Sequence, residues 1–143
     1  MFVLVMFFAL SSSVQALSWA YGFVVLDGKV YEVLPEVIVA EGEVGKVIGK
    51  VKTEPNDMTG SYYGNASNYY PIGTKYAEIE GVNITEAIAV EEDGYWVKAV
   101  YSHDAMFHIM NILTSPWVIG AIVFVLLLLA MFMKKSLNNR AGF

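Results

Sequence analysis

Four tyrosines in a polar stretch between positions 53 and 71 are the residues best suited to molecular recognition. The stretch includes Ser61-Tyr62-Tyr63-Gly64-Asn65-Ala66-Ser67-Asn68-Tyr69-Tyr70. Tyrosine gives a large contact area and a hydroxyl group at low entropic cost, and Asn and Ser add adaptable hydrogen bonds. Long loops of compact domains are often functional. We therefore predict a solvated ligand-binding loop whose candidate residues are Tyr62, Tyr63, Asn65, Asn68, Tyr69 and Tyr70. The alternative is that alternate tyrosines pack on the rim of a sheet.

Other combinations of chemistry-bearing residues are weak. Glu78 and Glu80 share one face of a predicted strand and could perturb each other's protons, which is the basis of a small-hydrolase hypothesis, but the sequence shows no opposing acid. His103 and His108 lie five residues apart, a poor spacing for metal ligands on a helix. The chain has no cysteine, which excludes thiolate nucleophiles and zinc–thiolate sites. We predict no enzymatic activity, catalytic residue, metal or cofactor.

The charge distribution restricts the choice of partner. All 14 acidic residues lie between Asp27 and Asp104 together with six lysines, so this part carries a net charge of −8. The three remaining basic residues, Lys134, Lys135 and Arg140, follow a long apolar run. An acidic domain repels phosphate backbones, so we expect no nucleic-acid partner.

Two Asp-Gly pairs, at positions 27–28 and 93–94, predict β-hairpins, because a type I′ turn needs positive φ at both central residues. A two-residue loop at 93–94 pairs Glu92 with Tyr95, and Val90 with Val97. One face of this hairpin is then apolar, and the other, carrying Ala89, Glu91, Trp96 and Lys98, is expected to face water. The first hairpin is apolar on both faces, which predicts deeper burial.

Further strands are predicted by composition and spacing at 35–40, 44–51 and 74–80, with a turn at 41–43. The fold class is therefore mainly β. We predict a small antiparallel sheet of about six strands over residues 21–104, curled as a half-barrel or a sandwich, and a C-terminal transmembrane helix.

The N-terminal segment is typical of a secretory signal peptide. Residues 1–10 are apolar throughout, and Val14 and Ala16 are the small residues of a cleavage site after Ala16. Cleavage after Ala20 also fits the pattern. No Lys or Arg precedes the apolar run, so an uncleaved membrane anchor is the alternative.

The C-terminal run from Pro116 to Met133 contains no charged residue. Its 18 residues are enough to cross the hydrocarbon core if Lys134 and Lys135 reach the interface. We predict a juxtamembrane segment at 105–115, a transmembrane helix at 116–133 and a basic cytoplasmic tail at 134–143. Positive charge after the span places the acidic domain outside the cytoplasm of a single-pass, type I protein of the cell membrane.

Four segments carry a resemblance to a known set of proteins: Trp19–Val25, Val44–Val51, Gly73–Tyr76 and Glu86–Glu91. Together they resemble small, β-rich envelope proteins of Gram-positive bacteria, secreted or tethered to the membrane. The resemblance covers roughly Trp19–Tyr101 and implies a location and a fold. Its motifs are structural, so it implies no site.

The function expected from these features is that of a non-catalytic, membrane-tethered extracytoplasmic domain that binds a protein or a cell-wall component. The alternative is a small accessory subunit of a membrane protein complex that contacts its partners through the transmembrane helix.

Overall fold

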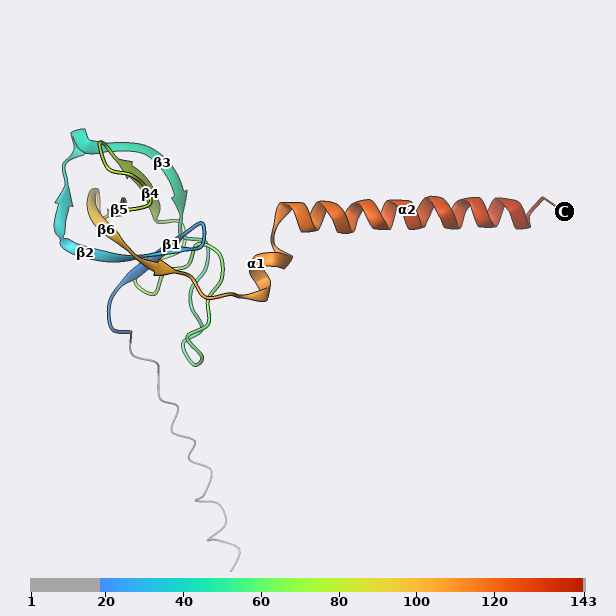
Figure 1. Ribbon diagram of the computed structural model, residues 1–143, viewed down its shortest axis with the longest axis horizontal. Helices are drawn as coiled ribbons and strands as arrows, with labels where there is room; N and C mark the ends of the chain where they lie inside the picture. The colour runs from blue at the N-terminus through green and yellow to red at the C-terminus, as the bar shows by residue number, and fades with distance from the viewer. Residues whose placement is uncertain (1–18, 143) are drawn as a thin grey trace, which may run out of the picture. The chain divides into compact units, whose positions relative to one another are not determined.

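The computed structural model describes residues 19–142, which fall into two compact units, one ending at Ala105 and one beginning at Met106. The first unit is built mainly of strands and the second of helices (Figure 1). The predicted signal peptide at 1–16 lies outside the described residues.

The first unit is a six-stranded antiparallel sheet curled into a half-barrel (Figure 1), which confirms the predicted fold class. Its edges are the first and third strands, since the spatial order is β1-β2-β6-β5-β4-β3. The strands are β1 (Phe23–Leu26), β2 (Lys29–Val39), β3 (Val44–Lys50), β4 (Lys75–Ile79), β5 (Ala87–Glu92) and β6 (Tyr95–Asp104).

One long strand, β2, includes both the second strand of the first predicted hairpin and the separate strand predicted at 35–40. The pairing of β2 with β6 continues through this region, but its register shifts between Leu34 and Ile38. Pro35 lies in the shifted stretch, where its missing N–H costs no ladder hydrogen bond. The turn predicted at 41–43 is a short 3-10 helix, η1 (Glu41–Glu43).

Both predicted hairpin turns are present. Asp27 and Asp93 have φ of 48° and 45°, and the glycines that follow them are also positive, at 79° and 89°. The pairs Glu92–Tyr95 and Val90–Val97 have the register expected from the sequence. A two-residue type I′ turn fixes that register because its twist matches the strands it joins.

The apolar core fills the inside of the half-barrel. Its largest fully buried side chains include Tyr31, Tyr76 and Ile88. The opposite face of the β5–β6 hairpin is not open to water as predicted, because Ala89 is fully buried and Trp96 is half-buried. Both pack in a second cluster with Val39, Ala77, Ile79 and Ala87. Small side chains at these positions allow apolar residues from neighbouring strands to cover the face.

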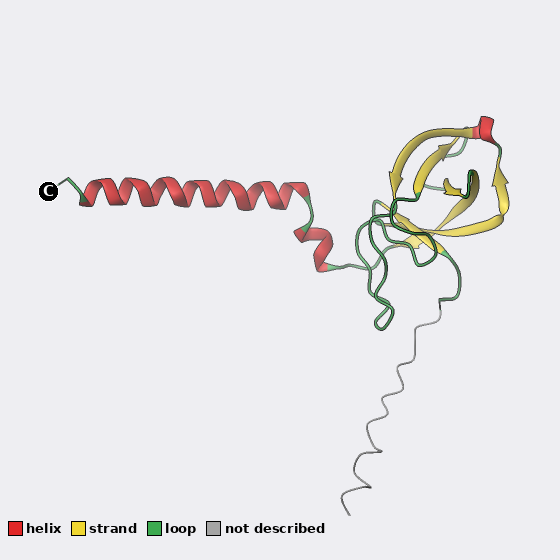
Figure 2. Cartoon of the chain, turned by 180° about the vertical axis from the view of Figure 1, so that it is seen from behind, coloured by secondary structure: helices red, strands yellow, loops and turns green. Residues whose placement is uncertain are grey.

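The second unit consists of α1 (Ile109–Leu113) and α2 (Pro116–Arg140) (Figure 2). Helix α2 begins at the predicted residue, where proline suits the first helical position. It continues beyond Met133 into the segment predicted as the tail and ends at Arg140. At 1.5 Å per residue, its apolar part from Pro116 to Met133 is about 27 Å long, close to the thickness of a hydrocarbon core. This helix is long and apolar enough to cross a membrane.

Candidate functional site

The long connection between β3 and β4 carries the candidate binding residues, and its middle returns to the open side of the half-barrel (Figure 2). Isolated bridges join Ser67 to Val24 of β1 and Ala66 to Thr53, which follows β3. The amide of Val25 donates to the carbonyl of Ala66 at 2.8 Å. The loop is therefore hydrogen bonded both to β1 and to the chain that leaves β3.

Two of the candidate residues use their side chains to complete the edge of β1. The Asn68 side chain accepts a hydrogen bond from the Phe23 amide at 2.8 Å and donates to the Tyr21 carbonyl at 2.9 Å. The Asn65 side chain accepts from the Asp27 amide at 3.2 Å. A primary amide offers the same donor and acceptor as a peptide group, so these side chains replace a missing neighbouring strand. The side-chain amides of Asn65 and Asn68 therefore have a structural role.

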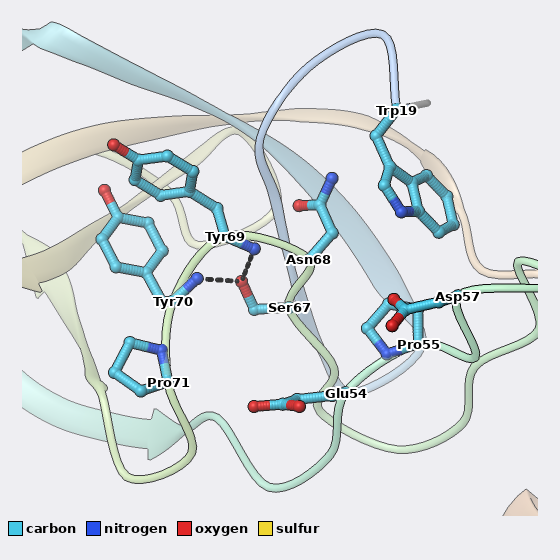
Figure 3. Close-up of a pocket in the computed structure, with 9 residues that line it drawn as sticks. All are labelled: Trp19, Glu54, Pro55, Asp57, Ser67, Asn68, Tyr69, Tyr70 and Pro71. Atoms are coloured by element: carbon cyan, nitrogen blue, oxygen red, sulfur yellow. Dashed lines mark hydrogen bonds between the residues drawn. The ribbon is translucent and has the colours of Figure 1, made fainter. Parts of the chain in front are cut away.

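Ser67 fixes the turn that carries the last two tyrosines. Its buried hydroxyl donates to the carbonyl of Phe23 at 2.8 Å. The same oxygen accepts from the amides of Tyr69 and Tyr70, at 3.1 and 2.9 Å (Figure 3). Three hydrogen bonds on one oxygen hold the turn against β1. Sequence reasoning missed this role, which depends on a contact 44 residues away in the chain.

The four tyrosines do not share one environment. Tyr70 is only 6% exposed and belongs to the main core, so the prediction that it lies on a solvated loop is wrong. Tyr62 is half-buried and packs on Phe23, with ring centroids 5.1 Å apart. Tyr63 is also half-buried, whereas Tyr69 is 60% exposed. Only Tyr69 keeps most of its surface for a ligand.

Burial also changes the acidity of two of these phenols. Burial raises the pKa of Tyr62. The pKa of Tyr70 is raised well above its usual range, first by burial and then by the hydrogen bond to Glu92. The Tyr70 hydroxyl is the donor in that hydrogen bond, to Oε2 of Glu92 at 2.6 Å.

A cleft of about 440 Å³ opens beside Tyr69. Figure 3 shows Trp19 and Asp57 on one side of it, Tyr69 and Tyr70 on the other, and the carboxylate of Glu54 below and between them. Pro55, Ser67, Asn68 and Pro71 complete the lining. The cleft thus combines aromatic surface with two acidic groups, and none of the described residues that line it is basic.

Trp19 is positioned by its contact with β1. Its ring meets that of Phe23 edge-on, with centroids 5.1 Å apart, and both residues pack in a cluster on the outer side of β1. The sequence offered only a weak signal for this role, because Trp19 stands next to the predicted cleavage sites. Glu54 and Asp57 were likewise recognised only as loop residues.

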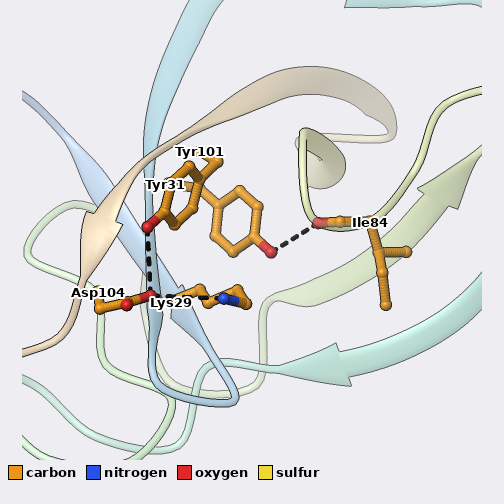
Figure 4. Close-up of polar contacts among 5 residues, drawn as sticks. All are labelled: Lys29, Tyr31, Ile84, Tyr101 and Asp104. Atoms are coloured by element: carbon orange, nitrogen blue, oxygen red, sulfur yellow. Dashed lines mark hydrogen bonds and ion pairs between the residues drawn. The ribbon is translucent and has the colours of Figure 1, made fainter.

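A separate polar cluster joins β2 to β6 (Figure 4). Lys29 forms an ion pair with Asp104 at 3.4 Å, and the Tyr101 hydroxyl donates to the same carboxylate at 3.2 Å. The buried Tyr31 donates to the carbonyl of Ile84 at 2.6 Å. Exposed ion pairs stabilise little, so this cluster mainly orders the strand ends.

The remaining titratable candidates do not converge. Glu78 and Glu80 line a separate hollow of about 520 Å³ in which the described lining holds no further acid or base. His103 lies on β6, whereas His108 begins α1, where its Nδ1 accepts from the Met110 amide at 3.1 Å. Across residues 19–142, no three His, Asp or Glu side chains are arranged as metal ligands.

The cleft beside Tyr69 is therefore the candidate site that the geometry supports best. Comparisons with protein-family models, curated proteins and solved structures found no match to this chain.

Proposed function

We propose that this protein is a non-catalytic binding domain, tethered to the cell membrane by α2, that recognises a protein segment or a cell-wall component outside the cytoplasm. The observation that carries the proposal is the cleft between Trp19 and Tyr69, which presents exposed aromatic surface next to the Glu54 and Asp57 carboxylates. Such surfaces bind rings and apolar side chains while the polar groups fix their orientation.

The side chains on both sides of the cleft are fixed in place by contacts with β1, and this supports a binding role. Ser67 and Asn68 fix the Tyr69 turn to β1, and Phe23 of the same strand supports Trp19. The two aromatic walls are thus positioned by one strand. A ligand that enters between them does not have to order the loop first, which lowers the entropic cost of binding.

The position of Trp19 also bears on processing. Cleavage after Ala16 retains Trp19 in the mature chain, whereas cleavage after Ala20 removes one wall of the cleft. The proposal therefore includes a signal peptide that ends at Ala16. With Lys134, Lys135 and Arg140 on the cytoplasmic side, the cleft faces the outside of the cell.

The alternative function, an accessory subunit that contacts a complex through α2, is favoured by a shallow apolar depression on that helix. The depression is lined by Trp117, Val118, Ala121, Ile122, Val125 and Leu126. A small residue between larger ones lets a neighbouring helix approach closely.

Site-specific photo-crosslinking in living cells tests the proposal. A photoreactive phenylalanine analogue replaces Tyr69 in the full chain, and a control carries it at Ile38, an exposed position on β2. We expect Tyr69 to yield a crosslinked product that is lost on Glu54→Gln and Trp19→Ala. Equal products from both positions, or none from Tyr69, would contradict the proposal.

Replacing α2 by an unrelated leucine-rich span separates the two functions. A domain that binds through the cleft keeps the Tyr69 product after the exchange. Loss of the product with α2 favours the accessory-subunit role.

A further inference from the structure

The two edges of the half-barrel differ in how they are covered. The loop covers β1: the amides of Phe23 and Val25 in this strand, and of Asp27 just after it, all donate to residues 65–68. Strand β3 pairs with β4 on one side only. Among the described residues, no hydrogen bond crosses its other side between Val44 and Ile48. An edge of this kind presents free N–H and C=O groups to an additional strand.

Lysines gather around this open edge. Four of the six lysines of the acidic unit belong to β3, to the residues just after it, or to the start of β4: Lys46, Lys50, Lys52 and Lys75. All four are exposed. In the part of the chain that the structure describes, the only ion pair joins Lys29 to Asp104, so none of the four has a carboxylate within 4.0 Å.

Two of these lysines lie directly opposite each other. Lys50 and Lys75 are cross-strand partners of β3 and β4, so their side chains leave the sheet on the same face. Like charges at such positions destabilise a sheet. The arrangement is therefore unfavourable for the isolated domain and becomes favourable when an anionic group lies between the two ammonium groups.

We propose that the open edge of β3 binds an extended acidic peptide segment of a partner protein, which adds to the sheet as a further strand. The backbone of the edge supplies the ladder hydrogen bonds, and the lysines select for carboxylates. Val47, which is 50% exposed on this strand, provides an apolar contact at the same edge.

A second copy of this chain is the main competing occupant of the edge. Glu41 and Glu43 precede β3, and Lys50 and Lys52 lie at its other end, so two antiparallel copies would bring opposite charges together. Self-association of the chain without peptide, with slow amide exchange between Val44 and Ile48, would assign the edge to that second copy and overturn the proposal. No residue of β3 or β4 lines the cleft beside Tyr69, so this proposal and the proposed function can fail independently.

The test uses the full chain in nanodiscs of phosphatidylcholine, a lipid without net charge. The probe is a short fluorescent peptide of alternating glutamate and valine, and its binding is followed by fluorescence anisotropy. We expect Lys50→Gln with Lys75→Gln to weaken binding roughly tenfold, and added salt to weaken it further. The matched control, Lys98→Gln on β6, should bind like the unaltered chain.

Two further probes separate strand addition from attraction to any polyanion. N-methylation of alternate peptide bonds on the probe removes ladder donors without changing its charge, and we expect it to abolish binding. Amide hydrogen exchange between Val44 and Ile48 should slow when the unmodified peptide is bound. Equal binding of the N-methylated peptide or of inorganic polyphosphate would overturn the proposal. So would an absence of binding up to about 1 mM peptide, a weak affinity for any specific complex.

Discussion

The hydroxyl of Tyr70, at the end of the long loop, donates a hydrogen bond of 2.6 Å to Oε2 of Glu92 at the tip of the β5–β6 hairpin. The Tyr70 ring lies in the core cluster, and its hydroxyl reaches a half-buried carboxylate. One residue thus ties the loop to the core and to a hairpin 22 positions away. The tyrosines of this loop therefore divide into structural and exposed residues.

This division predicts different costs for neighbouring substitutions. Tyr70→Ser removes a buried ring and should destabilise the fold by about 3–5 kcal/mol. Tyr70→Phe removes only the hydrogen bond and should cost about 1 kcal/mol. Tyr69→Ser loses an exposed ring that meets Tyr70 edge-on and should cost about 1 kcal/mol. Thermal melts of the full chain in detergent rank the three variants, and a Tyr69 variant that melts below Tyr70→Ser would contradict this division.

Replacing Tyr76 by phenylalanine is expected to stabilise the fold. Its hydroxyl is fully buried and has no hydrogen-bond partner among the described residues. A buried donor without a partner costs free energy, so Tyr76→Phe should raise the stability by about 1 kcal/mol. Val90→Ala, in the same core cluster, is the control and should lower stability by roughly 1–3 kcal/mol. A lower melting temperature for Tyr76→Phe would show that the hydroxyl is satisfied.

The buried hydroxyl groups of Tyr70 and Tyr76 should make the stability of the fold decrease at alkaline pH. Burial raises the pKa values of Tyr70 and Tyr76 above the ordinary value of about 10. Above that pH the unfolded chain loses phenolic protons that the folded chain keeps, so stability is fully present below about pH 10 and falls as the pH rises further. Urea unfolding at increasing pH should show this loss, and Tyr76→Phe should reduce it. A stability that is constant above pH 10 would contradict the expectation.

How much of the fold can be predicted from the sequence depends on the distance between the interacting residues. The register of the β5–β6 hairpin was predicted pair by pair, because Asp93 and Gly94 fix a two-residue turn and the side chains alternate. The continuity of β2 was not predicted, since Pro35 looks like a strand boundary until β6 is known to pair on both sides of it.

The candidate site was predicted only in part, for the same physical reason. Composition identified the loop but could not distinguish Asn68, whose side chain pairs with a backbone 45 residues earlier, from a residue that contacts a ligand. It could not place Trp19 either. Both depend on long-range contacts with β1, which no local pattern encodes.

Substitution of Asn68 measures how much the hydrogen bonds from the loop to the edge of β1 stabilise the fold. Asn68→Ala leaves the amide of the buried Phe23 without its acceptor and should cost about 2–3 kcal/mol. Asn65→Ala removes a longer bond to the exposed amide of Asp27, which water can replace, and should cost about 1 kcal/mol or less. The uncovered edge should also make the Asn68 variant more prone to aggregation. Equal melting temperatures for the two variants would argue against this role.

The absence of cysteine from the chain allows a clean test of the proposed orientation. A single cysteine is introduced either at Met58, an exposed loop position, or at Asn139, near the end of α2. In intact cells a membrane-impermeant maleimide should label Met58→Cys, because the positive charges after the span hold the C-terminal end in the cytoplasm. Asn139→Cys should react only after the membrane is permeabilised.

Replacing Lys134, Lys135 and Arg140 by glutamine should weaken this preference and allow some Asn139→Cys to be labelled from outside. Labelling of Asn139→Cys in intact cells without that replacement would reverse the orientation and place the cleft beside Tyr69 on the cytoplasmic side.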